Sequence, residues 1–410
     1  MKKKSPLLNA IILIFILILI LLTSAGVIFF ANKFVPIDSY SHLIEDDSEL
    51  EMLRSLPYAQ SMEVFENDSE KVGVIYKNDD LMSDDYVFYD GKIINKNGSV
   101  IHYWPYVYAG IILDDGTYIA QYGYENESWG RFNFNGTPLW IVNERIHHDI
   151  TLSPWNTVFV LSMQVVDYNG RKVEFDVIEE YSLDGDFLGN FSIWDNFEEF
   201  HKYHPLTELD KSSNLKVSKE LTELNESNWG GDYQYYHMNN LEFVPPNDLE
   251  GVHPAFNPGN WILTFRQGNL VYILDKDTKK VLWFYGITAL DGPHAGQMLP
   301  SGNVLIFDNG YARGFSRVLE VSPVNLSVEF EYSDRANDFY TQSQGWVEKE
   351  SNGNYLITQT EKGRIFEITP DKEIVWEYWN PEVFDNNRTT IYRARPYSKD
   401  FIDSFLNNKS

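Results

Sequence analysis

A repeat of about 47 residues is the feature of this sequence that most limits its possible folds. The repeated phrase is a strand, a turn rich in Asp, Asn or Gly, and a second strand that usually ends in an aromatic residue, as in GRFNFNGTPLWIV and RIFEITPDKEIVWEYWN. Aligned copies fall in steps of 49, 94, 47 and 46 residues, and 94 is twice 47, at Trp140, Gly189, Trp283, Phe330 and Trp376. Such a fixed period indicates repeated copies of one supersecondary unit.

A second phrase alternates with the first and predicts another hairpin. It joins a short strand to a very apolar strand through a turn centred on Gly or Asn, as in GIILDDGTYIAQ and GQMLPSGNVLIFDN. Two hairpins per repeat give four antiparallel strands, and several such units around an axis form a β-propeller. Six units fit between Val72 and Tyr397. We therefore expect an all-β fold, a six-bladed β-propeller over residues 71–400, since a β-sandwich would not explain a regular four-strand period.

Two segments do not follow the repeat. Residues 194–231 are charged and partly helical in pattern, which predicts a loop insertion over one face of the propeller. Residues 32–70 are acidic, and we expect them to form a short stalk or cap.

The N-terminus has the pattern of a membrane anchor. The sequence MKKK precedes an apolar run at residues 7–31, which is long enough to cross a bilayer as a helix. Lysines remain on the cytoplasmic side, so residues 1–6 are predicted to be cytoplasmic and the propeller to lie outside the cell. A cleaved signal peptide is the alternative, but its apolar region is normally shorter than this run.

Composition restricts the partners of the chain. It has 33 Lys and Arg against 60 Asp and Glu, a net charge of −27, so phosphates are repelled and no nucleic acid partner is expected. The absence of cysteine excludes disulfides and thiol chemistry. Glycosylation of an exported chain would use the Asn-X-Ser/Thr sequons at Asn67, Asn97, Asn126, Asn135, Asn190, Asn225, Asn325, Asn387 and Asn408.

Three histidines occupy one position of the repeat. His148 and His294 each stand eight residues before the turn residue of their second phrase, Asn156 and Gly302. His237 belongs to the same series although its turn is longer, because HDITLSP, HMNNLEF and HAGQMLP align from the histidine. The innermost strands of a propeller line its central channel, and equivalent positions lie at one height. We therefore expect the three imidazoles to converge at one mouth of the channel.

Arg266 is predicted to join the three histidines. It ends the returning strand of its hairpin, and a hairpin brings that end back to the face where its first strand began. Asn239 and Asn309 are candidates for the same rim, and His147 could exchange roles with His148. The other histidines lie outside the register and are interpreted as surface or loop residues.

Three histidines and an arginine suit two kinds of site. An oxyanion site would use the planar donors of arginine and the N–H groups of imidazoles, while a neutral imidazole can act as a nucleophile or shuttle protons. A metal site is the alternative, because three histidines can hold zinc. An arginine aimed at the same point disfavours a cation, so no metal is expected.

Several motifs of the chain resemble those of one enzyme family. They are HHD at 147–149, DYQYYHMN at 232–239, FRQGNLVYILDKDTKKVLWFYG at 265–286, HAGQMLPSGNVLIFDNG at 294–310 with SRVLEV, GRIFEITPDKEIVWEY, and IYRARPY at 391–397. From about Tyr108 to Tyr397 the sequence resembles the arylsulfotransferases, exported six-bladed propellers that move sulfuryl groups between phenols without a nucleotide sulfate donor. The resemblance implies an aryl sulfate donor, a phenolic acceptor, ping-pong kinetics and no cofactor.

The resemblance also implies roles for individual residues. His294 would be the nucleophile that becomes a transient sulfohistidine, and His148, His237, Asn239 and Arg266 would hold the sulfuryl oxygens and manage protons. Preorganised donors of this kind are usually the largest catalytic contribution when negative charge spreads over oxygens.

The chain departs from the family pattern at one position. The family often has Asp directly after the nucleophile, where it could orient the imidazole, and this chain has Ala295.

Two other functions are alternatives to sulfuryl transfer. A binding propeller for sulfated or glycan ligands is the first alternative, and the N-glycosylation sequons suit such a surface protein. A metal or quinone enzyme is the second, although the chain lacks the vicinal cysteines that some quinoproteins use.

Overall fold

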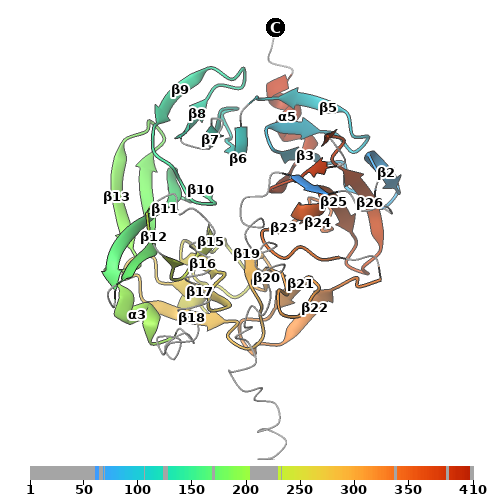
Figure 1. The fold of residues 1–410 in the computed structure, drawn as a ribbon. Helices are drawn as coiled ribbons and strands as arrows, with labels where there is room; N and C mark the ends of the chain where they lie inside the picture. The colour runs from blue at the N-terminus through green and yellow to red at the C-terminus, as the bar shows by residue number, and fades with distance from the viewer. Residues whose placement is uncertain are drawn as a thin grey trace, which may run out of the picture. The chain divides into compact units, whose positions relative to one another are not determined.

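Six β-sheets arranged around a central axis account for most of the chain that the computed structural model describes (Figure 1). The predicted six-bladed propeller is therefore confirmed. The described residues are 61–63, 68, 70–105, 107–122, 128–168, 171–203, 230–231, 233–336, 339–384 and 387–406.

The four main strands of each blade pair antiparallel, and outside blade 1 these four strands follow the chain from the axis outward. Blade 1 contains β29 (Ala394–Tyr397), β3 (Tyr86–Tyr89), β4 (Lys92–Ile94) and β5 (Val100–Tyr103); blade 2 contains β6 (Val107–Ile112), β7 (Tyr118–Tyr122), β8 (Ser128–Phe132) and β9 (Pro138–Val142); blade 3 contains β10 (Ile150–Leu152), β11 (Thr157–Tyr168), β12 (Arg171–Ser182) and β13 (Phe187–Ser192). Blade 4 contains β15 (Met238–Phe243), β16 (Trp261–Phe265), β17 (Leu270–Leu274) and β18 (Val281–Tyr285); blade 5 contains β19 (Pro293–Met298), β20 (Val304–Asp308), β21 (Arg317–Val321) and β22 (Val328–Tyr332); blade 6 contains β23 (Trp346–Lys349), β24 (Tyr355–Gln359), β25 (Arg364–Ile368) and β26 (Ile374–Trp379).

The ring is closed by strands from both ends of the described chain. The late strand β29 is the inner strand of blade 1 and pairs with the early strand β3, with Ala394 opposite Tyr89. The early strand β2 (Gly73–Lys77) pairs with β26 as a fifth, outer strand of blade 6. Closure of a ring leaves only short protected edges, which is how propellers avoid open sheet edges. Because of this closure, residues just before β29 lie at the channel.

Apolar side chains fill the space between neighbouring blades. Neighbouring residues of β16 point to opposite sides: Leu263 packs with Phe159 between blades 3 and 4, whereas Ile262 packs with Ile306 between blades 4 and 5. A strand that is covered on both faces needs apolar residues at every position. This explains why the second phrase of the repeat reads as a continuous apolar run instead of an alternation.

Blade 3 is larger than the other blades. Its strands β11 and β12 are each 12 residues long, and the short strand β14 (Tyr233–Gln234) pairs with β12 in parallel. The predicted insertion at 194–231 begins after β13 and contains the helix α3 (Phe197–His201). Its residues 204–229 lie outside the described part of the chain.

Smaller elements complete the described structure. They are β1 (Ser61–Glu63), β27 (Val383–Phe384) and β28 (Asn387–Thr389), which form a three-stranded sheet, the short 3₁₀ helices η5 (Pro254–Phe256) and η6 (Thr360–Lys362), and the helix α5 (Lys399–Leu406). Within the part of the chain that is described, no helix combines the length and the apolar character needed to cross a membrane. The predicted cytoplasmic residues 1–6, the predicted membrane span 7–31 and most of the predicted stalk 32–70 lie outside the described residues.

Candidate active site

The candidate histidines lie where the chain enters the inner strands of blades 3, 4 and 5. His148 and His237 adopt left-handed backbone conformations, with φ of 59° and 54°, immediately before or beside β10 and β15. In blade 5 the left-handed residue is Ala295, with φ of 54°, and not His294. The equal sequence spacing therefore hides an offset of one residue in backbone geometry. A non-glycine residue in this conformation costs on the order of 1 kcal/mol, so surrounding contacts must hold it.

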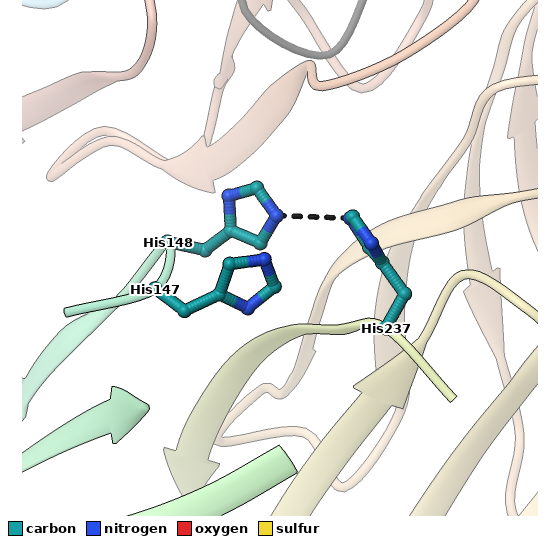
Figure 2. A group of neighbouring side chains, drawn as sticks. All are labelled: His147, His148 and His237. Atoms are coloured by element: carbon teal, nitrogen blue, oxygen red, sulfur yellow. Dashed lines mark hydrogen bonds between the residues drawn. The ribbon is translucent and has the colours of Figure 1, made fainter. Parts of the chain in front are cut away.

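His148 and His237 form a direct pair. Their Nε2 atoms are 2.9 Å apart, and Figure 2 shows the two rings meeting across the gap between their segments. His147 lies against this pair, with its ring centroid 3.8 Å from that of His148 and 5.0 Å from that of His237. The left-handed turn at His148 places two consecutive histidine rings on the same side of the chain.

The other ring nitrogen of His237 is held by a glutamine that the sequence reading did not identify. Its Nδ1 hydrogen-bonds with Oε1 of Gln234. The Nε2 of Gln234 donates to Oε2 of Glu174 at 3.1 Å and to Sδ of Met163 at 3.3 Å, which orients the amide. His237 Nδ1 must therefore be the donor to Gln234, because the amide oxygen can only accept.

The other ring nitrogen of His148 faces the segment that closes the ring. Its Nδ1 lies 3.2 Å from the hydroxyl of Tyr392, and the same hydroxyl donates to the backbone carbonyl of His148 at 2.9 Å. The next residue, Arg393, forms an ion pair with Asp149. The motif IYRARPY was visible in the sequence, but its spacing did not show that these residues reach the histidines.

Asp149 connects the segments that carry His148 and His237. Its buried carboxylate accepts from the backbone N–H of Leu241 at 3.0 Å, and that residue belongs to β15, the strand at whose start His237 lies. The same carboxylate pairs with Arg393 of the closing segment. A buried charge with several partners of this kind fixes the relative positions of the three segments.

His294 has a different environment from the pair. Its Nδ1 lies 2.7 Å from Oδ1 of Asn309 and 3.1 Å from the backbone carbonyl of Gly292. The amide nitrogen of Asn309 donates to the carbonyls of Thr341 at 2.9 Å and Gln344 at 2.6 Å, so the amide oxygen must face the imidazole. Nδ1 of His294 is therefore the protonated nitrogen, and Nε2 makes no hydrogen bond to a described residue.

Ala295 is packed in the hydrophobic core and does not orient the ring beside it. It is fully buried in the cluster that contains Leu305 and Phe307. The orienting role that an Asp could fill at this position is filled here by Asn309 and the carbonyl of Gly292. An oxygen that accepts a hydrogen bond from Nδ1 fixes the tautomer of a histidine whichever residue supplies it.

Arg266 lies in the same neighbourhood as the histidines. Its backbone N–H donates to the carbonyl of His237 at 3.0 Å, as the predicted hairpin requires. Burial and, to a smaller extent, the positive charge of Arg266 lower the pKa of His294 to about 3. Burial, neighbouring imidazoles and Arg266 also hold the pKa values of His148 and His237 well below the usual range. His294 is therefore neutral at pH 7, and the surroundings of His148 and His237 disfavour a proton on either ring of that pair.

Asn239 links blade 4 to the segment that carries His294. Its Nδ2 donates to the backbone carbonyl of Pro293 at 2.7 Å, and its side chain is 2% exposed. Its Oδ1 is buried and has no hydrogen-bond partner among the described residues. The substrate-binding roles predicted for Asn239, Asn309 and His147 stay predictions. Asn239 contacts the neighbouring blade 5, whereas Asn309 contacts His294 of its own blade and the segment before β23.

The histidines that could hold a metal are not the three that the repeat register selects. His147, His148 and His237 offer nitrogen atoms that all lie within 4.8 Å of one another. Three imidazoles in this range suit zinc, and Nδ1 of His147 lies 3.9 Å from the carboxylate of Asp176. The charge of Arg266, which lowers the pKa of two of these three histidines, opposes a cation at the same point.

Comparisons with known proteins assign the chain to a family. Similar solved structures include a protein of unknown function from Bacteroides caccae, which is 12% identical with a TM-score of 0.45 over 77% of this chain and 99% of that chain. Virginiamycin B lyase from Staphylococcus aureus is 13% identical with a TM-score of 0.39 over 80% of this chain and 89% of that chain. At these TM-scores the likenesses carry no argument about function.

No curated protein matches the sequence. The family model described as Arylsulfotransferase (ASST) matches residues 94–381, which is more than half of the chain and includes every candidate site residue. The chain belongs to the arylsulfotransferase (ASST) family.

Proposed function

We propose that this protein is a nucleotide-independent aryl sulfotransferase that carries the sulfuryl group on His294. Family membership supports the class of activity. The observation that carries the choice of residue is the arrangement of His294, whose Nδ1 is held by two oxygen acceptors while its Nε2 makes no hydrogen bond to a described residue.

The protonation state of His294 suits a nucleophile. Burial lowers its pKa to about 3, so the ring is neutral at pH 7. Because Nδ1 donates to Asn309 and Gly292, the lone pair is on Nε2. A positioned neutral imidazole with a free lone pair can attack an electrophilic sulfur.

The first half-reaction transfers the sulfuryl group to the protein. Nε2 of His294 attacks sulfur, the bond between sulfur and the aryl oxygen breaks, and the aryl oxygen keeps the bonding electron pair. The departing oxygen takes the additional proton of the protonated His148–His237 pair, which leaves the pair neutral. The sulfurylated ring then carries positive charge, which the acceptors on Nδ1, Asn309 Oδ1 and the Gly292 carbonyl, stabilise.

The second half-reaction reverses these changes with a new phenol. The phenol oxygen attacks sulfur, its proton passes to the His148–His237 pair, and the sulfur–nitrogen bond breaks with its electrons returning to Nε2. In both steps negative charge spreads over the sulfuryl oxygens. We assign to Arg266 the stabilisation of that charge, because its planar guanidinium matches a group of oxygens and its charge acts on all three histidines.

A burst experiment tests this function. The full-length protein is mixed with 4-nitrophenyl sulfate without acceptor, and one nitrophenol per protein molecule is expected, together with a mass gain of one sulfuryl group on His294. Adding phenol should then restore turnover. His294→Ala should lower transfer by at least about 10⁴-fold, as removal of a nucleophile does in other enzymes.

A matched histidine variant controls for general effects of the substitution. His253 is exposed, and its Nδ1 accepts from the backbone N–H of Ala255 at the start of η5, so His253→Asn keeps an acceptor there. This variant should transfer at the wild-type rate. Wild-type protein that binds aryl sulfates without a burst would instead support the alternative of a binding propeller. Unchanged transfer by His294→Ala would exclude His294 as the carrier.

We also propose that the propeller works outside the cell on an N-terminal anchor. The proposal rests on the apolar run at 7–31 after MKKK and on the direction that the positive-inside rule gives it. Membrane fractionation of the full chain, with protease added outside intact cells, tests it. A propeller that stays in the soluble fraction or is protected from the protease would contradict it.

A further inference from the structure

The hydroxyl of Tyr392 has two competing acceptors on one residue. It lies 2.9 Å from the backbone carbonyl of His148 and 3.2 Å from Nδ1 of the same histidine. A tyrosine hydroxyl has one proton and can also accept. Burial raises the pKa of Tyr392 to about 12, so the hydroxyl keeps its proton at neutral pH. It can therefore donate to the carbonyl or to Nδ1, but not fully to both.

At the other end of the pair, Nδ1 of His237 has a hydrogen-bond partner that can only accept. Gln234 donates its amide N–H groups to Glu174 and Met163, so its oxygen faces His237 and requires a proton on Nδ1 of that histidine. When His237 is neutral, its Nε2 carries only a lone pair. The 2.9 Å contact between the two Nε2 atoms then requires the proton to be on His148.

Two protonation states of the pair satisfy these contacts. In the neutral pair, His148 holds its proton on Nε2, and its bare Nδ1 accepts from Tyr392. In the protonated pair, Nδ1 of His148 also carries a proton and donates to the oxygen of Tyr392, whose own proton turns to the carbonyl of His148. Rotation of one hydroxyl therefore accommodates the gain or loss of one proton without moving either ring.

We propose that Tyr392 is a positioning residue that switches its hydroxyl between the carbonyl and Nδ1 of His148, and so lets the His148–His237 pair store the proton exchanged with the aryl oxygen. The use of this proton in transfer rests on the proposed function. The two protonation states themselves are properties of the folded protein and can be observed without any reaction.

The other groups around His148 make the stored proton easy to release. The ring of His147 packs against it, and the positive charge of Arg266 disfavours a proton on it. Nearby Asp149 is paired with Arg393, so its charge is compensated. The group that faces Nδ1 is a neutral hydroxyl, which stabilises a protonated imidazole less than a carboxylate would. A relay needs such a balance, because it must give the proton up in one half-reaction and accept it in the other.

Tyr392→Phe removes the switch and keeps the ring. Single-turnover rates are measured with phenyl sulfate, whose leaving oxygen needs a proton, and with 4-nitrophenyl sulfate, whose leaving oxygen needs it much less. We expect about a 10-fold or larger loss with phenyl sulfate and less than about a threefold loss with 4-nitrophenyl sulfate, within the range of general acid catalysis. A purely structural defect would slow both donors equally, and equal losses would overturn the proposal.

Tyr397→Phe is the matched control on the same closing segment. The hydroxyl of Tyr397 accepts from the backbone N–H of Ile112 at 2.9 Å, so the substitution also removes one partly buried hydrogen bond but none at the histidines. The ratio of rates for the two donors should stay at its wild-type value in this variant. A shift as large as that in Tyr392→Phe would overturn the proposal.

Nuclear magnetic resonance of ¹⁵N-labelled histidines separates this inference from the proposed function. On acidification, the pair in Tyr392→Phe should take up its proton at lower pH than in the wild type, because the acceptor for Nδ1–H is gone. This result would support the switch even if the wild-type protein showed no sulfuryl transfer. Identical titration of the pair in both proteins would overturn it.

Discussion

The hydrogen-bonding environment of His294 differs from that of the His148–His237 pair, and the two environments suit the imidazole for different chemical roles. His294 has one nitrogen fixed by Asn309 and Gly292 and the other without a hydrogen bond to any described residue. In the His148–His237 pair all four ring nitrogens have hydrogen-bond partners, namely Tyr392, Gln234 and the opposite imidazole. A free lone pair suits bond formation with sulfur, whereas a hydrogen-bonded chain suits proton storage.

The contrast arises from the hydrogen-bond partners of the rings and not from the histidines themselves. The partner of His294 comes from β20's end in its own blade, and that partner is itself anchored to carbonyls before β23. The partners of the pair come from the closing segment before β29 and from β14 beside the long strand β12. The proposed division of roles can therefore be tested by changing partners as well as histidines. The His294→Ala substitution described above should have the largest effect.

The next largest effect is expected from His237→Ala, which breaks the pair and leaves His294 intact. General acid–base groups typically contribute 10²- to 10⁴-fold, so transfer from phenyl sulfate should fall by roughly that factor. Transfer from 4-nitrophenyl sulfate should fall less, and added imidazole should partly restore the phenyl sulfate rate. If both donors lose equally and imidazole restores nothing, the pair does not handle the proton.

A smaller effect is expected from Asn309→Ala, which removes the acceptor on Nδ1 of His294. Loss of a group that orients a functional histidine typically costs about 10- to 100-fold, so the burst should become slower while keeping one equivalent of nitrophenol. Asn309→Asp retains an acceptor for Nδ1 but loses the donors to Thr341 and Gln344. We expect it to keep more of the burst rate and to have a lower melting temperature. Equal burst rates in the two variants would contradict the orienting role.

The smallest expected effect is on the pH dependence of the unfolding free energy, through the buried imidazole of His294. His294 has a pKa lowered by burial to about 3 in the folded protein, against 6.5 as the ordinary value. Between these values the unfolded chain binds one more proton, so this residue stabilises the fold above about pH 6.5 and the contribution is lost as the pH falls toward 3. The slope is about 1.4 kcal/mol per pH unit.

The wild type and His294→Gln should therefore differ in the pH dependence of their unfolding free energy. Urea unfolding between about pH 4 and 6 should show the shallower dependence in the variant. Buried carboxyls act in the opposite direction, as at Asp176, where burial raises the pKa to about 7, and the comparison between the two proteins cancels their contribution. Parallel curves would show that His294 is not neutral and buried in the folded state.

Much of the fold was accessible from the sequence because the repeat is a local property. The turns and apolar strands of each four-strand unit can be identified from the residues of that unit alone. Six units therefore predict six blades without knowledge of the contacts between them. The same logic placed Arg266 beside His237, since strand pairing within one hairpin fixes which residues lie opposite.

The partners of the histidines were not accessible in this way. Equal spacing from a turn aligned His294 with His148, although the left-handed residue of blade 5 is Ala295. A β-bulge in the inner strand β19 adds a residue to the pairing, so the distance in sequence from the turn no longer fixes the backbone conformation of each position. Gln234 was part of a recognised motif, and Tyr392 was part of another, but neither motif indicates which atom a side chain faces.

The sequence by itself determined the propeller, the number of its blades, the placement of His148, His237 and His294 where the chain enters the inner strands, and the position of Arg266 at the end of the second strand of blade 4. Only the tertiary structure decided which nitrogen of each imidazole is engaged and by what. The physical reason is that periodicity and hairpin pairing depend on residues close in the chain, whereas Tyr392 meets His148 from a position 244 residues away. Contacts at that distance exist only after the ring has closed, and they set the chemistry of the site.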